Sequence, residues 1–429
     1  MTYGERYIQY NLRRQYLDDR IITGLDIGTS KVSVVIAEIN DSGVLEIIGV
    51  GKAPCNGLRR GVVVNIEATV QSIVKAIEDA ELMSGREIRS CFTGIAGANI
   101  EGINSRGVVA VSGKNREISQ DDINRVIEAA RAIAIPMDRE ILHVIPQSFI
   151  VDDQKGIKNP LDMIGVRLEA EVHIITGSLT TTQNLVRCIN RAGFVVDGLI
   201  LQTLAASKAL LTDDEKELGS MIIDLGGGTT DALLFVEGAP YFSASVGVGG
   251  IQVTNDLSIV LKIPLDAAER IKIEQGTCFL PHIDPAETVI IPGLPGKAPS
   301  EIPRINLAQI MQPRIEEILH LLREKIVTMN YMHYLKGGIV LTGGGAQMNG
   351  IVDLVQEIFN MPVRVGIPSS LGGLTEEYQK PEHATAVGLV LMGAERLYAG
   401  TGVREKSEKG SSSKRTVLKK ISDWFKEMF

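Results

Sequence analysis

Two aspartates, each followed by a glycine turn, are the residues of this sequence best suited to chemistry. Asp26 opens the stretch DIGTSK and Asp224 opens the stretch DLGGGTTD. Glycine amides can point directly at a phosphate because no Cβ stands in the way. Carboxylates beside such a turn suit hydrated Mg²⁺, which prefers oxygen ligands and keeps several waters. The two stretches therefore predict a phosphate-binding site with a magnesium ion.

Short apolar runs on both sides of each turn must position these residues, so strand, turn, strand is the expected local structure. The aspartates lie 198 positions apart, which predicts two similar halves that face one nucleotide. A third cluster, Gly343-Gly344-Gly345, ends another apolar run. Either turn alone is also compatible with a tight hairpin, and the combination favours phosphate binding. Neither a GxxxxGK[ST] loop nor a GxGxxG motif after a strand occurs, which argues against P-loop and Rossmann sites.

The composition indicates a globular protein. At 429 residues the chain is too long for one core, so two domains are the default. Alternating strands and helices predict an α/β protein with mixed sheets. Four cysteines without CxxC spacing are typical of reduced, buried thiols in a cytosolic protein. The net charge of −8 makes nucleic acid an unsuitable partner for the body of the chain.

The two ends of the chain differ from the body. Residues 404–429 contain eight Lys or Arg against four Asp or Glu. One helical face of this end collects apolar side chains, among them Leu418, Ile421, Trp424, Phe425 and Phe429. A helix packed on the body is one interpretation, but a helix in an anionic membrane interface is favoured. The polar first 20 residues predict a flexible or loosely docked arm.

The motifs DIGTSK, DLGGGTTD and GIVLTGGGAQMNG together resemble the actin-like ATPase superfamily. They are similar to its first phosphate loop, its second phosphate loop and its adenosine motif. Within that superfamily, the segments HVIPQSF, GIKNPLDMIGVRLEAEVHIIT and LTDDEKELG resemble the bacterial cell-division family FtsA, over roughly residues 21–397. The resemblance implies an actin-like two-domain fold with duplicated mixed-sheet cores, an inserted small subdomain and a C-terminal amphipathic helix.

The same resemblance implies how the chain is divided. The expected parts are an arm at 1–20, a first core at 21–87 and 173–204, an inserted subdomain at 88–172, a second core at 205–255 and 321–398, a small subdomain at 256–320, a flexible linker at 399–416 and a membrane-targeting helix at 417–429. The first 20 residues extend beyond the usual start of the family, and the resemblance does not account for them.

The resemblance also implies roles for single residues. Asp26 and Asp224 would hold Mg²⁺ through water, and Gln202 would position the attacking water, which makes Gln202 and Asp224 the catalytic candidates. Two loops would enclose the phosphates of ATP: Gly28, Thr29, Ser30 and Lys31, and opposite them Gly226, Gly227, Gly228 and Thr229. The adenosine contacts would be Glu269, Lys272, Gly343, Gly344 and Gly345. From the residues alone, Lys31 is also compatible with an ordinary exposed lysine, Gln202 with a lone buried glutamine, and Glu269 with Lys272 with a surface salt bridge.

The implied function is an ATP-binding actin-like polymer, at most a slow ATPase, that anchors the FtsZ division ring to the cytoplasmic face of the inner membrane. The implied partners are further copies of the chain, anionic inner-membrane lipid, later division proteins and the C-terminal tail of FtsZ. That tail would dock around residues 256–320, with Arg304 and Arg314 as basic contacts. A chaperone ATPase and a sugar kinase are the alternatives. The first would need a substrate-binding domain after residue 400, and the second a base aspartate in a sugar cleft.

Overall fold

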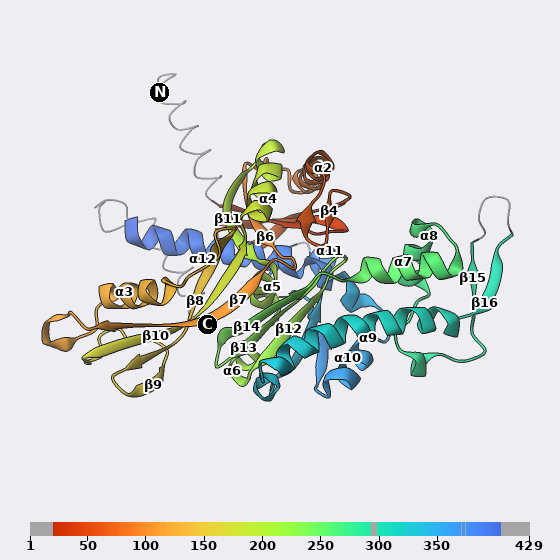
Figure 1. Cartoon of the computed structure of the whole chain (residues 1–429). Helices are drawn as coiled ribbons and strands as arrows, with labels where there is room; N and C mark the ends of the chain where they lie inside the picture. Colours follow the sequence, from red (N-terminus) through yellow and green to blue (C-terminus); the bar gives the residue numbers. More distant parts are fainter. Residues whose placement is uncertain (1–19, 293–297, 370, 374, 405–429) are drawn as a thin grey trace, which may run out of the picture.

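The computed structural model describes residues 20–292, 298–369, 371–373 and 375–404. Two central mixed sheets form the middle of the molecule (Figure 1). A four-stranded sheet with α3 projects on one side of them, and a helical unit with the β15–β16 hairpin projects on the other. The prediction of an α/β protein with duplicated mixed-sheet cores is confirmed.

The first core is a six-stranded sheet. β1 (Ile21–Ile27) pairs antiparallel with β2 (Lys31–Ile39), and β2 pairs antiparallel with β3 (Leu45–Pro54). On its other edge β1 pairs parallel with β6 (Ser90–Ile95), which pairs parallel with β11 (Val195–Leu201). The short β19 (Gly372–Gly373) lies beside β3. The helices α2 (Ile66–Ser84) and α4 (Leu179–Arg191) pack against this sheet and against each other.

The second core repeats this plan. β12 (Ser220–Leu225) pairs antiparallel with β13 (Thr230–Val236), and β13 pairs antiparallel with β14 (Ala239–Val246). β12 also pairs parallel with β17 (Gly338–Thr342), which pairs parallel with β18 (Val363–Val365). The order and directions match those of β3, β2, β1, β6 and β11. Each aspartate-glycine turn therefore joins the first two strands of its own half, as the sequence predicts.

A four-stranded sheet is inserted between β6 and β11. Its order is β7 (Glu101–Ala110), β10 (Arg167–Ser178), β8 (Arg139–Val151) and β9 (Gln154–Ile157). α3 (Gln120–Arg131) covers this sheet and begins at a capping box between Ser119 and Asp122. The resemblance implies that the insertion starts at residue 88. In the structure β6 belongs to the first core instead, because it pairs with β1 and β11.

A helical unit is inserted between β14 and β17. It contains α7 (Gly250–Leu261), α8 (Leu265–Glu274), α9 (Ile305–Thr328) and a hairpin of β15 (Thr288–Ile291) with β16 (Ser300–Pro303). The buried apolar faces of α7, α8 and α9 share one core with the second sheet. α10 (Ile351–Phe359) packs against α9 and β18 and completes that core.

The two cores are joined by α5 (Gln202–Leu210) and α6 (Asp213–Leu218), and the chain returns to the first core through α12 (Ala384–Arg404). α12 packs on β1 and α5. This close packing requires glycine, because a Cβ at Gly388 would collide with the backbone of Ala205. α12 differs from the sequence-based division in two ways: it packs on the first core, and it continues through residues 399–404, which were assigned to the linker.

Candidate functional site

The two aspartate-glycine turns have the same internal hydrogen bond. The amide of Gly28 donates to the carbonyl of Lys31 at 2.9 Å, and the amide of Gly226 donates to the carbonyl of Thr229 at 3.0 Å. Donor and acceptor are three positions apart in both turns, with two residues between them. The sequence duplication is thus a duplication of backbone geometry, and each turn presents its glycines at the end of a buried strand.

The two turns lie against each other, so the two halves form one site. A Cβ added to Gly227 would stand 2.8 Å from Oγ of Ser30, and one added to Gly228 would stand 2.5 Å from Oγ1 of Thr29. Any larger residue at these positions would push the turns apart. The hydroxyl of Thr29 also accepts a hydrogen bond from the amide of Gly61 at 3.1 Å, which fixes its direction. The structure brings together the two loops that the sequence predicted would enclose phosphate.

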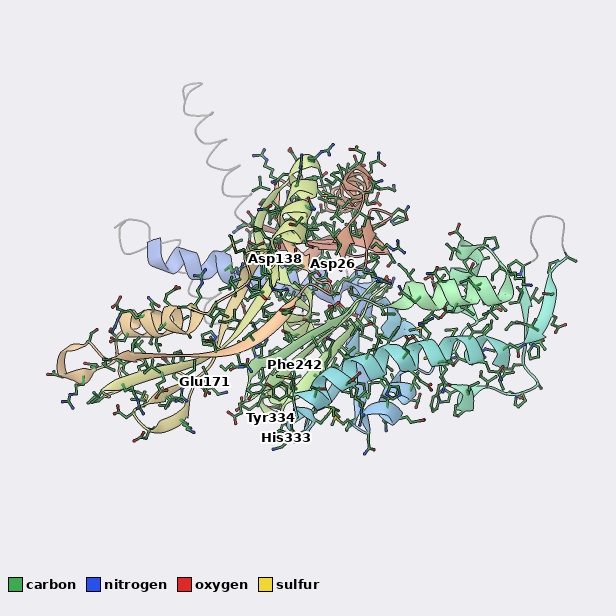
Figure 2. All side chains as sticks on the ribbon, viewed as in Figure 1. Asp26, Asp138, Glu171, Phe242, His333 and Tyr334 are labelled. Carbon is green, nitrogen blue, oxygen red and sulfur yellow. The ribbon has the colours of Figure 1, made fainter. Side chains whose placement is uncertain are left out.

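Asp26 and Asp224 lie at the start of these turns, and Gln202 lies beside them. Nε2 of Gln202 donates to Oδ1 of Asp26 at 2.7 Å. Burial raises the pKa of Asp26 to about 6. Burial, and repulsion from Asp231 and Asp26, raise the pKa of Asp224 to about 7. A cation bound between these two acids would stabilise their ionised forms. Figure 2 shows Asp26 at the centre of the molecule.

Gln202 reaches this position because it is the first residue of α5. From the residues alone, the run Leu199 to Leu211 is expected to form a connecting helix that contains Gln202, and this prediction is wrong about where the helix begins. Residues 195–201 form β11, and the helix begins only at Gln202. The apolar residues before it are paired with β6 in the sheet, and this tertiary pairing outweighs their helical pattern.

A small cavity separates the two loops. Its volume is about 30 Å³, and its lining includes Gly28, Thr29, Gly61, Gln202 and Thr229. This volume holds about one or two waters and no nucleotide. The loops must therefore separate before a triphosphate can lie between them. The side chain of Gln202 lines this cavity.

Lys31, the one cation predicted at the phosphates, has a carboxylate partner that the sequence analysis missed. Nζ of Lys31 lies 2.5 Å from Oε2 of Glu382, and Glu382 also binds Lys52 at 2.9 Å. Burial lowers the pKa of Lys31, and Glu382 opposes that effect. Glu382 lies 351 positions away in the sequence, and no local pattern marks it as a partner.

Asp231, the last residue of DLGGGTTD, is a second group that the site assignment left out. It is cross-strand partner to Asp224 in the β12–β13 pair. Its carboxylate accepts a hydrogen bond from Oγ1 of Thr229 at 2.7 Å. Burial raises its pKa, and hydrogen bonds from side chains and from the Gly97 backbone oppose that rise. The motif DLGGGTTD ends in Asp231, so this second acid could have been assigned to the site from the sequence.

The predicted adenosine residues surround the carboxyl end of the second sheet. Gly343 has a positive φ of 82°, and a Cβ there would collide with Oδ1 of Asp224. Nζ of Lys272 lies 2.7 Å from Oε2 of Glu269 and donates to the carbonyl of Gly250 at 3.2 Å. The amide of Gly250 itself donates to the carbonyl of Gly226 in the second glycine turn. The two α8 side chains thus form the ion pair given as the alternative and also lie next to the loop.

The two predicted partner arginines occupy different surroundings. Arg314 binds Asp256 at 2.6 Å and lines a groove of about 370 Å³ between α7 and α9. Ile259 and Val260, also in the lining, are 72% and 58% exposed. Arg304 lies outside this groove and binds Glu287 at 2.5 Å. Of the two predicted arginines only Arg314 lines the groove, and no sequence pattern marks Ile259 and Val260 as exposed beside it.

Two further features bear on the predictions. Among the described residues, no three His, Cys, Asp or Glu side chains form a group that could hold a metal ion directly. No helix in the described part of the chain is long and apolar enough to cross a membrane. The tail residues Leu418, Ile421, Trp424, Phe425 and Phe429 lie outside the described residues, as do residues 1–19 and 405–416.

Solved structures show to which class this fold belongs. The chain is similar to a chain of the PilM–PilN type IV pilus biogenesis complex, with a TM-score of 0.62 and 17% identity over 87% of this chain and 98% of that one. It is also similar to MreB5 of Spiroplasma citri bound to ADP, with a TM-score of 0.52 and 14% identity over 91% of this chain and 100% of that one. The duplicated sheets and facing glycine turns define an actin-like protein.

Sequence relatives define the family. A model of the cell division protein FtsA matches residues 221–388, and a model of the SHS2 domain inserted in FtsA matches residues 97–176. The chain is 48% identical to FtsA of Borreliella burgdorferi, over 95% of this chain and 99% of that protein. It is 36% identical to FtsA of Escherichia coli K12, over 96% and 99%. The chain belongs to the FtsA family of cell division proteins.

Proposed function

We propose that the chain binds ATP with Mg²⁺ between its two glycine turns and assembles into actin-like filaments at the division site. The observation that carries the proposal is the pair of equal turns that face each other, each preceded by an aspartate whose pKa is raised. Asp26 and Asp224 would hold Mg²⁺ through water, and the ion would offset the charge of these acids and of the phosphates. The related fold of MamK, solved as a double helical filament, supports assembly.

Calorimetry of Mg·ATP binding by an Asp224→Ala variant tests the site. Loss of one carboxylate should weaken binding roughly 10- to 100-fold, the usual range for a charged hydrogen bond. The matched control is Asp213→Ala, whose side chain is 59% exposed in α6. If Asp224→Ala binds as tightly as the parent protein, the site lies elsewhere.

The same titrations should depend on pH, because both acids must release protons before Mg²⁺ is held. With pKa values of about 6 for Asp26 and about 7 for Asp224, the affinity for Mg·ATP should rise between pH 6 and pH 8. The stability of the unliganded protein should change with pH in the opposite direction. Its folded state binds more protons than the unfolded chain, so its stability should fall as pH rises from about 4 to 7.

We infer slow hydrolysis in which Gln202 positions a water. Its amide faces the cavity between the loops and is oriented by the hydrogen bond to Asp26. The backbone amides of the turns would bind the phosphate charge, and most of the catalysis would be positioning.

We propose that the groove between α7 and α9 receives the C-terminal tail of FtsZ. Exposed apolar residues beside Arg314 suit a peptide with apolar anchors and acidic groups.

We further propose that residues 417–429 lie in the anionic inner membrane on its cytoplasmic face. Their apolar face and surrounding lysines support this, and filaments would multiply a weak contact through many tails. Later division proteins would be recruited to that assembly.

A further inference from the structure

The helix that carries Gln202 begins without a side-chain cap. Its N-cap is Leu201, which makes no side-chain hydrogen bond to the first turn of α5. In a capping box, the side chain of the third helical residue accepts a hydrogen bond from the N-cap amide. In α5 that residue is Leu204, which has no acceptor. Leu201 is buried, so its amide needs an acceptor from outside the helix.

The acceptor is His143, which belongs to strand β8 of the inserted sheet. The amide of Leu201 donates to Nε2 of His143 at 3.0 Å, and His143 is 8% exposed. A neutral imidazole that accepts at Nε2 carries its proton on Nδ1. Burial and the positive charge of Arg396 lower the pKa of His143 to about 4. The ring is therefore neutral near pH 7, and Nε2 remains an acceptor.

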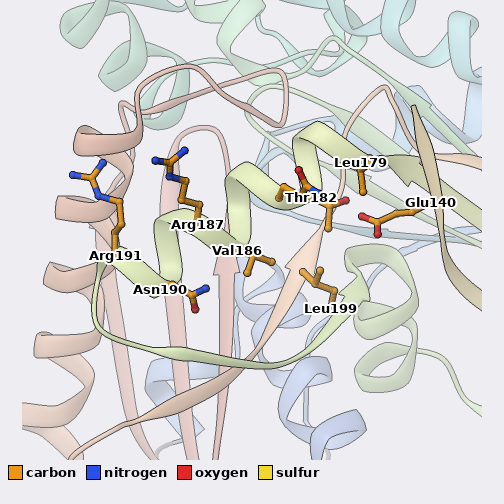
Figure 3. Close-up of a pocket in the computed structure, with 9 residues that line it drawn as sticks. Glu140, Leu179, Thr182, Val186, Arg187, Asn190, Arg191 and Leu199 are labelled. Atoms are coloured by element: carbon orange, nitrogen blue, oxygen red, sulfur yellow. The ribbon is translucent and has the colours of Figure 1, made fainter. Parts of the chain in front are cut away.

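The first residues of β8 lie beside the end of β11. Glu140 of β8 and Leu199 of β11 line one groove together with α4 (Figure 3). The cross-strand partner of His143 on β10 is Ile175, which is buried in the apolar core between the first sheet, α2 and α4. Later residues of β8 belong to the separate core of the inserted sheet and α3. β8 therefore spans both cores, and His143 is held at the end that is packed in the first core.

The side chain of Gln202 is fixed by two further contacts. Its Nε2 donates to Oδ1 of Asp26 at 2.7 Å. A Cβ on Gly94 would stand 2.8 Å from Cγ of Gln202, so the glutamine side chain lies directly against β6. Together with the anchor at the preceding amide, these contacts position Gln202 from β1, β6 and β8. Two of the three strands belong to the first sheet, and the third belongs to the inserted sheet.

We propose that His143 is a positioning residue, which holds the amide of Leu201 and thereby sets where Gln202 stands relative to the two glycine turns. The inference rests on the water-positioning role proposed for Gln202. Without the acceptor, the buried amide would lack a partner, and the start of α5 would shift or admit a water to satisfy it. This shift would displace Gln202 and leave both glycine turns in place. Loss of His143 should therefore lower turnover and spare the affinity for ATP.

Separate measurements of turnover and affinity on the full chain test this role. In His143→Gln the amide oxygen can occupy the place of Nε2, whereas in the shorter His143→Asn it cannot reach the Leu201 amide. His143→Asn should lower kcat for Mg·ATP about tenfold, less than the roughly hundredfold that a misplacement of about 1 Å can cost. The Kd from calorimetry should stay within twofold of the parent value. His143→Gln should restore kcat to within threefold of the parent.

A second variant serves the same test if His143→Asn does not fold. His143→Leu fills the space of the ring with no polar atom and should give the same loss of kcat with the same Kd. Parent-like kcat in the folded variant that lacks the acceptor would overturn the proposal. A His143→Gln variant as slow as His143→Asn would also count against it, because the position of the acceptor would then not matter.

His173→Leu is the matched control. His173 is another buried histidine of the inserted sheet, at 1% exposed, and its ring nitrogens contact Asn104 and Ser243. It has no hydrogen bond to the start of α5 among those of the described residues. His173→Leu should leave kcat within twofold of the parent. Equal slowing by His173→Leu and His143→Asn would indicate a general loosening of the inserted sheet and would refute a specific role of His143.

A double variant separates this inference from the proposed function. If His143 acts through Gln202, adding His143→Asn to Gln202→Ala should slow turnover by less than twofold, because the group that it positions is gone. Multiplied effects would show that His143 acts independently, and the inference would fail. A Gln202→Ala variant with the turnover of the parent would remove both the proposed role of Gln202 and this inference. Slow Gln202→Ala beside a His143→Asn variant with parent turnover would exclude this inference alone.

Discussion

Replacing Glu382 with glutamine should destabilise the protein in a pH-dependent way. Glu382 binds Lys31 at 2.5 Å and Lys52 at 2.9 Å, and its side chain is only 15% exposed. Burial alone would raise its pKa, but the two lysines outweigh burial and lower the pKa to about 2, against 4.5 for an ordinary glutamate. The folded protein therefore holds this group as a carboxylate down to well below pH 4.5.

The magnitude follows from that pKa difference. A shift from 4.5 to about 2 on folding corresponds to about 3 kcal/mol of stability above pH 4.5. Lys52 is 50% exposed, and solvent screening of its charge reduces the figure to about 2 kcal/mol. This contribution is complete above pH 4.5 and is lost as pH falls toward 2. Glu382→Gln should thus lose about 2 kcal/mol at pH 7, and the difference from the parent should shrink below pH 4.5.

Urea unfolding of the parent and of Glu382→Gln at pH 7, 5.5 and 4 measures this difference. Glu217→Gln is the matched control, because Glu217 is 61% exposed and its ion pair with Lys158 is longer, at 3.5 Å. This substitution should change the free energy of unfolding by less than about 0.5 kcal/mol. Calorimetry with ATP provides a second readout, since Lys31 released from Glu382 should bind phosphate more tightly. No loss at pH 7, or a loss that persists unchanged to pH 4, would refute the reasoning.

Three further outcomes are expected. Gln202→Ala should slow ATP turnover at least tenfold and leave ATP affinity within about threefold; unchanged turnover would move water positioning to another residue. Ile259→Asp puts a charge among the exposed apolar residues of the α7–α9 groove. It should weaken the binding of an FtsZ C-terminal peptide at least tenfold, as measured by fluorescence anisotropy, whereas equal binding would exclude the groove as the peptide site. Trp424→Glu should abolish co-sedimentation with anionic liposomes and leave ATP binding unchanged; equal pelleting of parent and variant would contradict the membrane contact.

The sequence predicted the features that depend on local pattern. The glycine turns at Asp26 and Asp224 lie between strands because the apolar runs around them are long enough to be buried on both faces. The repeat of the motif also indicated that two halves face each other, and the equal hydrogen bonds at Gly28 and Gly226 show why such a repeat is informative. The same backbone geometry requires the same residue types at the same positions.

The features that were missed depend on tertiary pairing. Residues 199–201 were expected to start a helix and instead end strand β11, because β6 offers an unpaired parallel edge at that place. Glu382 carries no sign of its role, since its partners Lys31 and Lys52 are more than 300 positions away. α12 packs on the first core because Gly388 and Gly24 leave room for close contact, and such complementarity is visible only when both surfaces are known.

The short turn η5 (Pro381–His383) contacts both halves of the candidate site. Glu382 holds Lys31 of the first phosphate loop, and Nδ1 of His383 lies 2.8 Å from Oγ of Ser33 in β2. The carbonyl of Pro381 accepts hydrogen bonds from Oγ1 of Thr342 at 2.9 Å and from the amide of Gly343 at 3.3 Å. One three-residue turn thus ties the first glycine turn to the glycine cluster of the other half. If a nucleotide binds between the two halves as proposed, these contacts would resist their separation, and the strength of the Glu382 ion pairs should then govern how readily the site opens.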